Sequence, residues 1–185
     1  ANDGGSYDGS PICAADYFDT TQKENIHNIS TTNFDIASLD ADDDGKQTLI
    51  NTSGSFKVHI SNSAAGSSFG LKHTLFVDGD VVLSDDIIYS GLGPNFSLVV
   101  RGDIYIDKSV AQLDGLFVAQ PRDAGGGNVY TCTNEGNQFN NSSSDLWDNC
   151  RSRLVINGAV IAGKVKLQRV IDSLRDSLAG EPYAS

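Results

Sequence analysis

Three short stretches of the chain are near copies of one another. They read Thr74-Leu75-Phe76-Val77-Asp78-Gly79-Asp80-Val81-Val82-Leu83, Ser97-Leu98-Val99-Val100-Arg101-Gly102-Asp103-Ile104-Tyr105-Ile106 and Arg153-Leu154-Val155-Ile156-Asn157-Gly158-Ala159-Val160-Ile161-Ala162. Looser copies lie at Asp114–Ala119 and Phe56–Ile60. β-Branched and aromatic residues fit a pleated, half-buried surface, so each copy predicts a β-strand. The glycine inside each full copy predicts a corner or a bulge.

The spacing of the copies predicts the fold. Counted from Phe56, they begin again at Leu75, Leu98, Leu116 and Leu154, at intervals of 19, 23, 18 and 38 residues. Intervals near 20 residues match one coil of a β-solenoid, in which each strand pairs in parallel with its equivalent one coil later. We therefore expect a mainly β protein of the β-solenoid or parallel β-helix type, with the repeat domain over residues 53–163.

An antiparallel β-sandwich is the alternative fold. Asp78-Gly79 and Asn157-Gly158 are strong hairpin dipeptides, and each lies between two apolar runs. Arg101-Gly102 is a poor hairpin turn, yet it occupies the same place in the repeat. A corner explains all three copies, and this favours the solenoid.

The two ends of the chain differ from the repeats. Residues 1–52 are polar, with scattered apolar residues such as Tyr17 and Phe18, and we expect them to lie on the repeat domain as an irregular strap with one or two short strands. Residues 164–185 change period: apolar side chains from Val165 to Leu178 follow three- and four-residue spacing. This spacing predicts a helix that caps the last coil.

The sharpest local motif is an acidic turn in the strap. Asp40, Asp42 and Asp44 followed by Gly45 reproduce the first half of a calcium loop of the EF-hand or dockerin type. The expected ligand set is Asp40, Asp42, Asp44, the Lys46 carbonyl, Thr48 and Asn51. Asn51 replaces the bidentate acid of an EF-hand and no helix pattern flanks the loop, so the other interpretation is a solvated acidic turn. Bound Ca²⁺ would have a weak Kd, on the order of 10⁻⁴ to 10⁻³ M.

The cysteines predict one disulfide. Cys132 and Cys150 flank a polar segment within the expected insertion of residues 121–152. A disulfide between them would hold that segment and stabilise the fold by about 3 kcal/mol. Cys13 is left as a buried thiol or a link to another chain. Trp147, inside the expected loop, is a candidate for stacking on a sugar or another protein, or for packing the loop.

Composition limits the partners and the compartment. The formal net charge of −11 and the absence of Lys/Arg clusters argue against nucleic acid, and no apolar run is long enough to span a membrane. The chain starts at Ala1 and contains no Met, which is typical of a secreted protein after removal of a signal segment. Asn-x-Ser/Thr sequons at Asn28, Asn51, Asn95, Asn140 and Asn141 would carry glycans only in a host with that machinery.

No catalytic signature accompanies the repeats. His27, His59 and His73 are scattered, without a nucleophile motif, and no pair of carboxylates is singled out as a glycosidase pair. We expect a non-enzymatic extracellular protein, a structural or adhesive subunit of a self-associating surface assembly. The alternative is a carbohydrate-active β-helix enzyme or a carbohydrate-binding module.

The segments Leu113-Asp114-Gly115-Leu116-Phe117-Val118-Ala119-Gln120 and Ile156-Asn157-Gly158-Ala159-Val160-Ile161-Ala162 resemble secreted bacterial surface proteins of the β-solenoid type. Some of those proteins are associated with pilus-like or other extracellular assemblies. The resemblance covers residues 71–169 and implies a role at a surface or in a filament. It carries no catalytic residue across to this chain.

Overall fold

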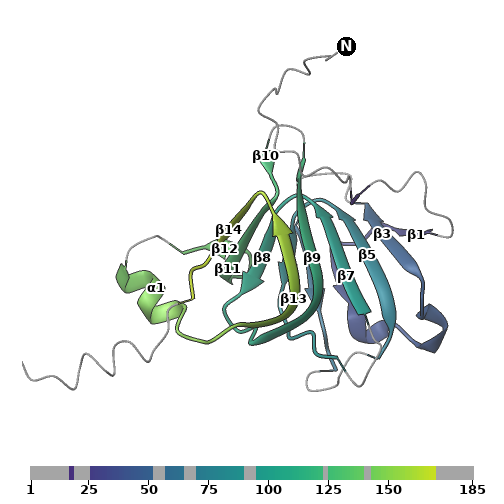
Figure 1. Ribbon diagram of the computed structural model, residues 1–185, viewed down its shortest axis with the longest axis horizontal. Coiled ribbons are helices and arrows are strands. Elements are labelled where there is room, and N and C mark those ends of the chain that lie inside the picture. The colour runs from purple at the N-terminus through teal and green to yellow at the C-terminus, as the bar shows by residue number, and fades with distance from the viewer. Residues whose placement is uncertain are drawn as a thin grey trace, which may run out of the picture.

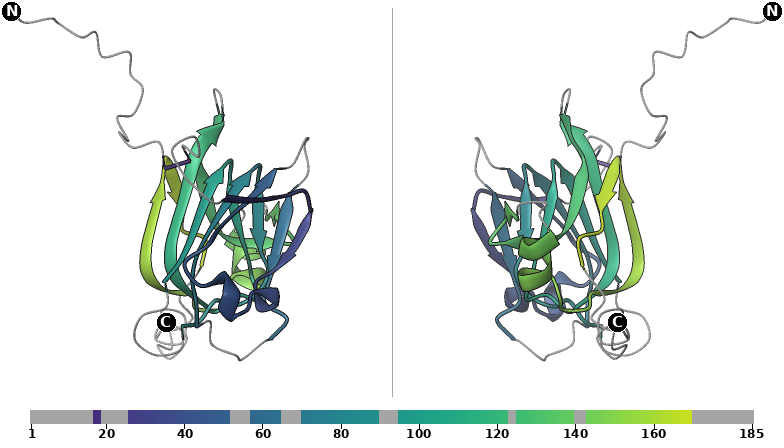
Figure 2. Two further views of the ribbon diagram at one scale, coloured as in Figure 1. Left: turned by 90° about the vertical axis from the view of Figure 1, so that its right-hand side faces the viewer. Right: turned by 90° about the vertical axis from the view of Figure 1, so that its left-hand side faces the viewer.

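The protein is described by a computed structural model over residues 17–18, 26–51, 57–64, 70–89, 95–122, 125–139 and 143–169. These residues form two sheets that face each other across a common core (Figures 1 and 2). The first sheet contains β1 (Ile26–Ile29), β3 (Gln47–Asn51), β5 (Lys72–Asp78), β7 (Asn95–Arg101), β9 (Gln112–Arg122), β10 (Gly125–Gly126) and β13 (Val155–Ala162). The second contains β2 (Asn33–Asp35), β4 (Val58–Ser61), β6 (Val81–Leu83), β8 (Ile104–Asp107), β11 (Asn128–Asn134), β12 (Asn137–Gln138) and β14 (Lys164–Lys166).

The chain alternates between the two sheets. Apart from the short β10 and β12, each strand of one sheet is followed by a strand of the other, and it pairs in parallel with the next strand of its own sheet. The predicted parallel pairing is confirmed. The antiparallel alternative is wrong, because β5 and β6, which flank Asp78-Gly79, belong to different sheets.

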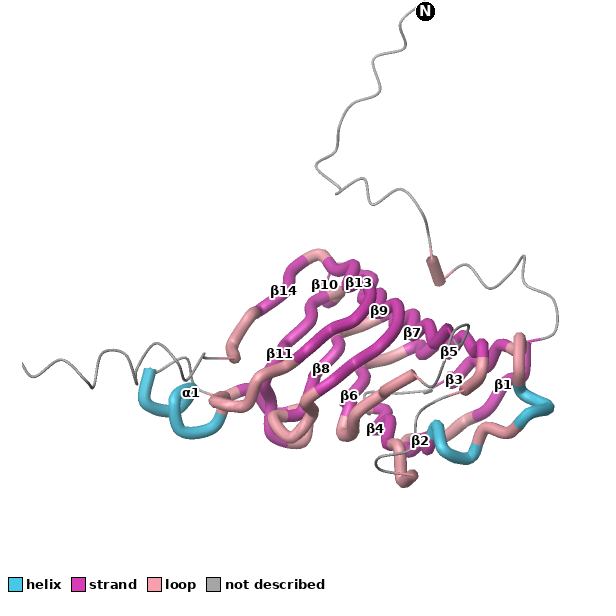
Figure 3. Tube along the Cα trace, turned by 60° about the horizontal axis from the view of Figure 1, so that its bottom comes forward, coloured by secondary structure: helices cyan, strands magenta, loops and turns pink. Residues whose placement is uncertain are grey.

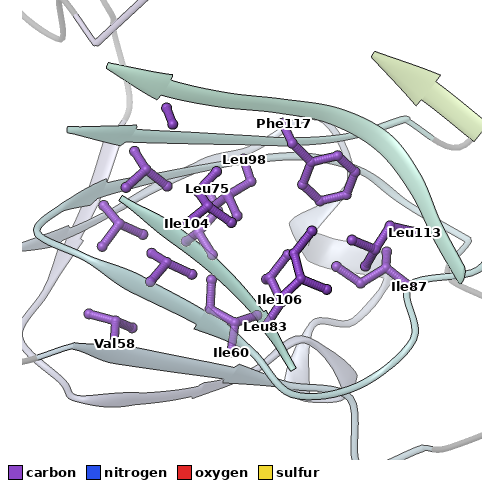
Figure 4. Close-up of a cluster of buried hydrophobic side chains, with 14 of the residues drawn as sticks. Val58, Ile60, Leu75, Leu83, Ile87, Leu98, Ile104, Ile106, Leu113 and Phe117 are labelled. Atoms are coloured by element: carbon purple, nitrogen blue, oxygen red, sulfur yellow. The ribbon is translucent and has the colours of Figure 1, made fainter. Parts of the chain in front are cut away.

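Inward side chains stack in register between the sheets (Figure 4). Leu75, Leu98, Phe117 and Val160 lie opposite one another on neighbouring strands of the first sheet. They meet Val58, Ile60, Leu83, Ile104 and Ile106 of the second sheet. Each fully buried Leu, Ile or Phe stabilises the fold by roughly 1.5–3 kcal/mol relative to an exposed one. The layered core thus comes from the period-two pattern of the repeats.

The register corrects the alignment of the copies. The residues opposite Leu75 and Leu98 are Phe117 and Val160, not Leu116 and Leu154. Gly79 and Gly102 lie at corners, as predicted, and a Cβ on Gly102 would approach the Gly79 carbonyl oxygen to 2.6 Å. Gly158 is not at a corner: it lies inside β13, beside Gly115 of β9.

Strands begin earlier than the repeat copies. Within the expected strap, β1 and β3 already belong to the first sheet and β2 to the second. Two short 3-10 helices, η1 (Ile36–Ser38) and η2 (Ala41–Asp43), form the connection between β2 and β3. The sheets therefore include residues 26–51 as well as the repeat domain.

The prediction of a C-terminal helix is wrong for its first residues. Lys164–Lys166 form β14, paired in parallel with Asn128–Tyr130 of β11, and residues 167–169 are not helical. Pairing with an available strand edge outweighs the local three- and four-residue spacing here. Residues 170–185, the rest of the predicted helix, lie outside the described residues.

The predicted insertion contains a strand of the second sheet. β11 buries the polar side chains of Thr131 and Thr133. Their hydroxyls donate to the carbonyl oxygens of Lys166 and Ile106, each at 3.0 Å, so neither hydroxyl lacks a partner. Helix α1 (Ser143–Asn149) follows β12 and is the only α-helix among the described residues.

Aspartates tie successive passes of the chain together, a pass being one strand in each sheet, as far as the pass that contains β9 and β11. Six carboxylates accept a backbone N–H from a residue 23–28 positions later, at 2.6–3.0 Å: Asp35 from Ser63, Asp44 from Lys72, Asp80 from Asp103, Asp86 from Ala111, Asp103 from Asn128 and Asp107 from Glu135. Turn N–H groups have no ladder partner, and an anionic acceptor satisfies them strongly. Part of the acidity of the sequence thus has a structural role.

Arg169 closes the last pass through hydrogen bonds to backbone carbonyls. Its guanidinium donates to the carbonyl oxygens of Asp107, Lys108, Val110, Thr131 and Ser152, at 2.6–3.2 Å. Burial lowers the pKa of Arg169 and the charge of Asp107 opposes that shift. This single side chain joins the end of β8, the turn after it, β11 and the segment before β13.

Candidate functional site

An apolar row runs across the outer face of the first sheet. Leu49, Phe76, Val99, Val118 and Ile161 lie opposite one another on β3, β5, β7, β9 and β13. Neighbouring residues of a strand point to opposite faces, so these side chains point away from the core that Leu75 and Val77 enter. We call this row the outer ladder.

Phe18 packs on the outer ladder. Its ring meets Phe76 edge-on with centroids 6.0 Å apart, and the Arg101 guanidinium lies 4.5 Å from the Phe18 ring centroid. The Phe18 N–H donates to Gln120 Oε1 at 2.8 Å. Phe18 and Phe76 are both buried as a result.

A polar cleft of about 500 Å³ opens beside the second sheet. Its lining comes from the sheet, from the turn after β8 and from the β11–β12 hairpin: Asn33, His59, Ser84, Asp107, Ser109, Asn134 and Glu135. From the sequence alone, His59 had no role beyond that of a scattered histidine, and no local signal linked it to Asn134 and Glu135, which lie 75 and 76 positions away. The cleft forms because successive parallel strands of the second sheet bring these residues side by side.

The hydrogen bonds inside the cleft hold its shape. The Ser109 hydroxyl lies 2.7 Å from Asp107 Oδ1, and the Glu135 N–H donates to Asp107 Oδ2. Burial raises the pKa of the Asp107 carboxyl, but the hydrogen bonds from Ser109 and Glu135 outweigh it and the net pKa is lowered. Asp107 is therefore an anionic acceptor committed to the turn. Hydroxyl, amide, imidazole and carboxylate groups remain as the lining, a set suited to a polar ligand such as a sugar.

An aromatic stack lies on the outer face of the second sheet. The rings of Tyr105 and Tyr130 are parallel, with centroids 4.9 Å apart. Lys57 Nζ lies 3.9 Å from the Tyr105 centroid and Lys166 Nζ lies 4.4 Å from the Tyr130 centroid. Both tyrosines are buried, so the stack stabilises the sheet surface and is not an open platform.

The predicted calcium ligands are placed as follows. The side chain of Asp40 caps η2 by accepting the Asp42 N–H, and Asp44 accepts the Lys72 N–H. The Lys46 carbonyl accepts the Thr74 N–H, and Asn51 is exposed at the end of β3. Among the described residues there is no group of three or more His, Cys, Asp or Glu side chains that could hold a metal ion. Calcium binding at this turn stays a prediction.

Thr48, on β3 just after the acidic turn, points inward and pairs with His73. His73 Nδ1 lies 3.3 Å from the Asp43 carbonyl oxygen and Nε2 lies 3.2 Å from Thr48 Oγ1. A carbonyl only accepts, so Nδ1 carries the proton and Nε2 accepts from the Thr48 hydroxyl. Both side chains are buried, and the neutral imidazole fastens the acidic turn to β5.

This pairing predicts a pH dependence. Burial is the main cause of the lowered pKa of His73, so the folded protein binds that proton less readily than the unfolded chain. The stabilisation is fully present above a pH of about 6.5 and is lost as the pH falls below it. Between pH 7.5 and 5.5, urea titrations should show a larger loss in the free energy of unfolding for the wild type than for His73→Gln. An exposed control, His27→Gln, should lose as much as the wild type. The same loss in all three proteins would contradict this role of His73.

The predicted disulfide is present. Cys132 of β11 and Cys150 after α1 are bonded, with Cα atoms 5.9 Å apart, and both are buried. The bridge holds α1 against β11. Trp147, in α1, has the Arg151 guanidinium 5.2 Å from its ring centroid. Cys13 lies outside the described residues.

Removing this bridge is expected to lower the free energy of unfolding by about 3 kcal/mol, through the freedom that the unfolded chain gains. The measurement is urea denaturation of Cys132→Ser/Cys150→Ser against the wild type. Cys13→Ser is the control, since it removes a thiol without opening this bridge. Equal midpoints for the double variant and the control would show that the bridge adds nothing to stability.

Comparisons with protein-family models, with curated proteins and with solved structures found no match to this chain. The fold itself defines the class of the protein, which is mainly β with two sheets of largely parallel strands. Within the described part of the chain, no helix has the length and apolar character needed to cross a membrane.

Proposed function

We propose that the protein is a β-solenoid that serves as a structural or adhesive subunit of an extracellular surface assembly, without enzymatic activity. The regular alternation of strands between two parallel sheets supports the solenoid. The Cys132–Cys150 bridge supports an oxidising, extracellular compartment.

The main support for assembly is that each sheet ends in strands that are paired on one side. Within the described residues, β1 and β2 at one end and β13 and β14 at the other each have one strand neighbour (Figure 3). The free side of such a strand presents backbone N–H and C=O groups that template further pairing. β13 runs for eight residues without a charge or a proline, the features that usually protect an edge. A subunit that adds strands at these ends satisfies its edges by assembling.

Negative-stain electron microscopy and light scattering of the purified protein test this proposal. We expect filaments or regular oligomers whose size grows with concentration. Repeating both measurements with millimolar Ca²⁺ and with chelator tests the calcium prediction at Asp40, Asp42 and Asp44, since ordering of that turn would strengthen assembly. A monomer at every concentration and in both conditions would overturn the assembly role.

The polar cleft favours a second candidate, a carbohydrate-binding module. Its lining of hydroxyl, amide and carboxylate groups around His59 matches what a sugar needs. Binding to a panel of neutral and acidic polysaccharides, lost in His59→Ala and kept in His27→Ala, would support it. Turnover of any of these polysaccharides would instead indicate an enzyme.

A further inference from the structure

The two ends of the stack carry opposite charge. The first pass through both sheets, residues 26–46, contains five aspartates and one lysine. The last described pass, residues 151–169, contains five basic residues and no acidic one, although the whole chain has a formal net charge of −11. Charges of this arrangement attract the first pass of one copy to the last pass of another.

The acidic and basic residues also lie at equivalent positions of their passes, at the crossing from the second sheet to the first. Asp40, Asp42, Asp43 and Asp44 precede β3, where the chain crosses from the second sheet to the first. Arg151 and Arg153 precede β13, at the same kind of crossing. Because the strands of a sheet are parallel, both crossings lie on one side of the molecule, the lower side in Figure 1. A copy translated along the stack brings the two corners together.

The basic end also exposes apolar side chains. Val165 of β14 is 40 % exposed, and Leu167 just after it is 82 % exposed. Arg153 is exposed as well, and so is Asp42 at the acidic end. Exposed apolar groups beside a strand edge that has no partner within the described part of the chain favour contact with another surface.

We propose that the partner is a second copy of this chain, docked head to tail. The Arg151–Arg153 corner of one copy contacts the Asp40–Asp44 turn of the next, and β13 and β14 lie beside the β1 and β2 of that next copy, so both sheets continue across the junction. This inference rests on the proposed assembly and names its contact surface. Such a contact joins two different patches, and because the next copy is translated along the stack, it produces an open filament and not a closed dimer.

Charge reversals at the two corners test the contact. Arg153→Glu and Asp42→Lys should each weaken association about tenfold, measured by sedimentation as a function of concentration. The double variant Asp42→Lys/Arg153→Glu, which restores opposite charges at the junction, should recover most of that loss. The effect of Arg153→Glu should fall as salt is added.

Lys164→Glu is the matched control. Lys164 is exposed in the same last pass but lies at the opposite corner, where residues 30–32 of the first pass carry no charge. The eight residues of β13 separate the two corners by roughly 26 Å, well beyond the screening length of about 8 Å at physiological salt. This variant should therefore associate nearly as the wild type does.

The outcomes separate the two proposals. A wild type that assembles, with Arg153→Glu and Asp42→Lys unaffected, overturns this contact and leaves the assembly role standing. Equal weakening by Arg153→Glu and Lys164→Glu also overturns it, since net charge alone would then explain the effect. A wild type that never assembles overturns both. Thermal unfolding of each variant at the wild-type midpoint confirms that its fold is intact.

Discussion

Replacing Gly158 with alanine is expected to lower the free energy of unfolding by about 4 kcal/mol or to prevent folding. Gly158 lies in β13 with φ +154°, a backbone conformation that L-residues rarely adopt. A Cβ at this position would lie 1.9 Å from the Gly115 carbonyl oxygen of β9. That oxygen is backbone, held by pairing along the whole of β13, so it cannot move aside without breaking the ladder.

Two other glycines make this a graded test. Gly125 has no atom within 4 Å of its would-be Cβ and no positive φ, so Gly125→Ala should change stability by less than about 0.5 kcal/mol. Gly45 has equally open space but φ +76°, so Gly45→Ala should cost about 1 kcal/mol from backbone strain alone. Urea denaturation followed by circular dichroism ranks the three. A Gly158→Ala protein as stable as Gly125→Ala would show that β9 and β13 are not paired in this register.

Replacing Arg169 with lysine should lower the free energy of unfolding by about 3 kcal/mol, with the charge retained. The guanidinium reaches five carbonyl oxygens in several directions, and an ammonium group with three donors on one atom cannot. The carbonyl groups left without a donor keep their desolvation penalty. Arg169→Ala should be worse, because it also removes the packing of the side chain.

Arg122→Lys is the control for this change. Arg122 is partly exposed and lies 3.9 Å from Asp78, an ion pair of the kind that contributes less than about 1 kcal/mol. The same urea titration should therefore place Arg122→Lys near the wild type. If Arg169→Lys has the same urea midpoint as Arg122→Lys, the positive charge of Arg169 holds the last pass, and its several N–H donors do not.

The sequence predicted the parallel sheets because the repeats bury Leu75 and Leu98 at equivalent positions. The sequence did not predict β11, which was included in the expected insertion because it is polar. Its Thr131 and Thr133 are buried because carbonyl oxygens from other passes accept their hydroxyl hydrogen bonds. The sequence-based prediction also failed at Lys164–Lys166, where the local period favours a helix and only the neighbouring β11 makes a strand. Glycine was a misleading marker of register, since Gly158 matches Gly115 inside a strand and not Gly102 at a corner.

The candidate sites divide in the same way. The Cys132–Cys150 bridge follows from two residues near each other in sequence, and it was predicted. The cleft around His59 and the outer ladder at Phe76 are assembled from residues on successive passes, so only the register reveals them. The acidic turn at Asp40–Asp44 was recognised, and the cap that Asp40 places on the Asp42 N–H is local, but the hydrogen bond from the Lys72 N–H to Asp44 comes from tertiary structure.

The strand ladders bear on how the molecule would respond to force. In both sheets the hydrogen bonds between neighbouring strands point along the stacking direction, so tension along a filament would load every bond of a junction together. The junctions are unequal. At the last pass β13 is paired with β9 over eight residues and β14 with β11 over three, while at the first pass β1 is paired with β3 over four and β2 with β4 over three. Within a subunit, the Ile26 end is therefore the mechanically weak one, and stretching would detach the first pass before the last.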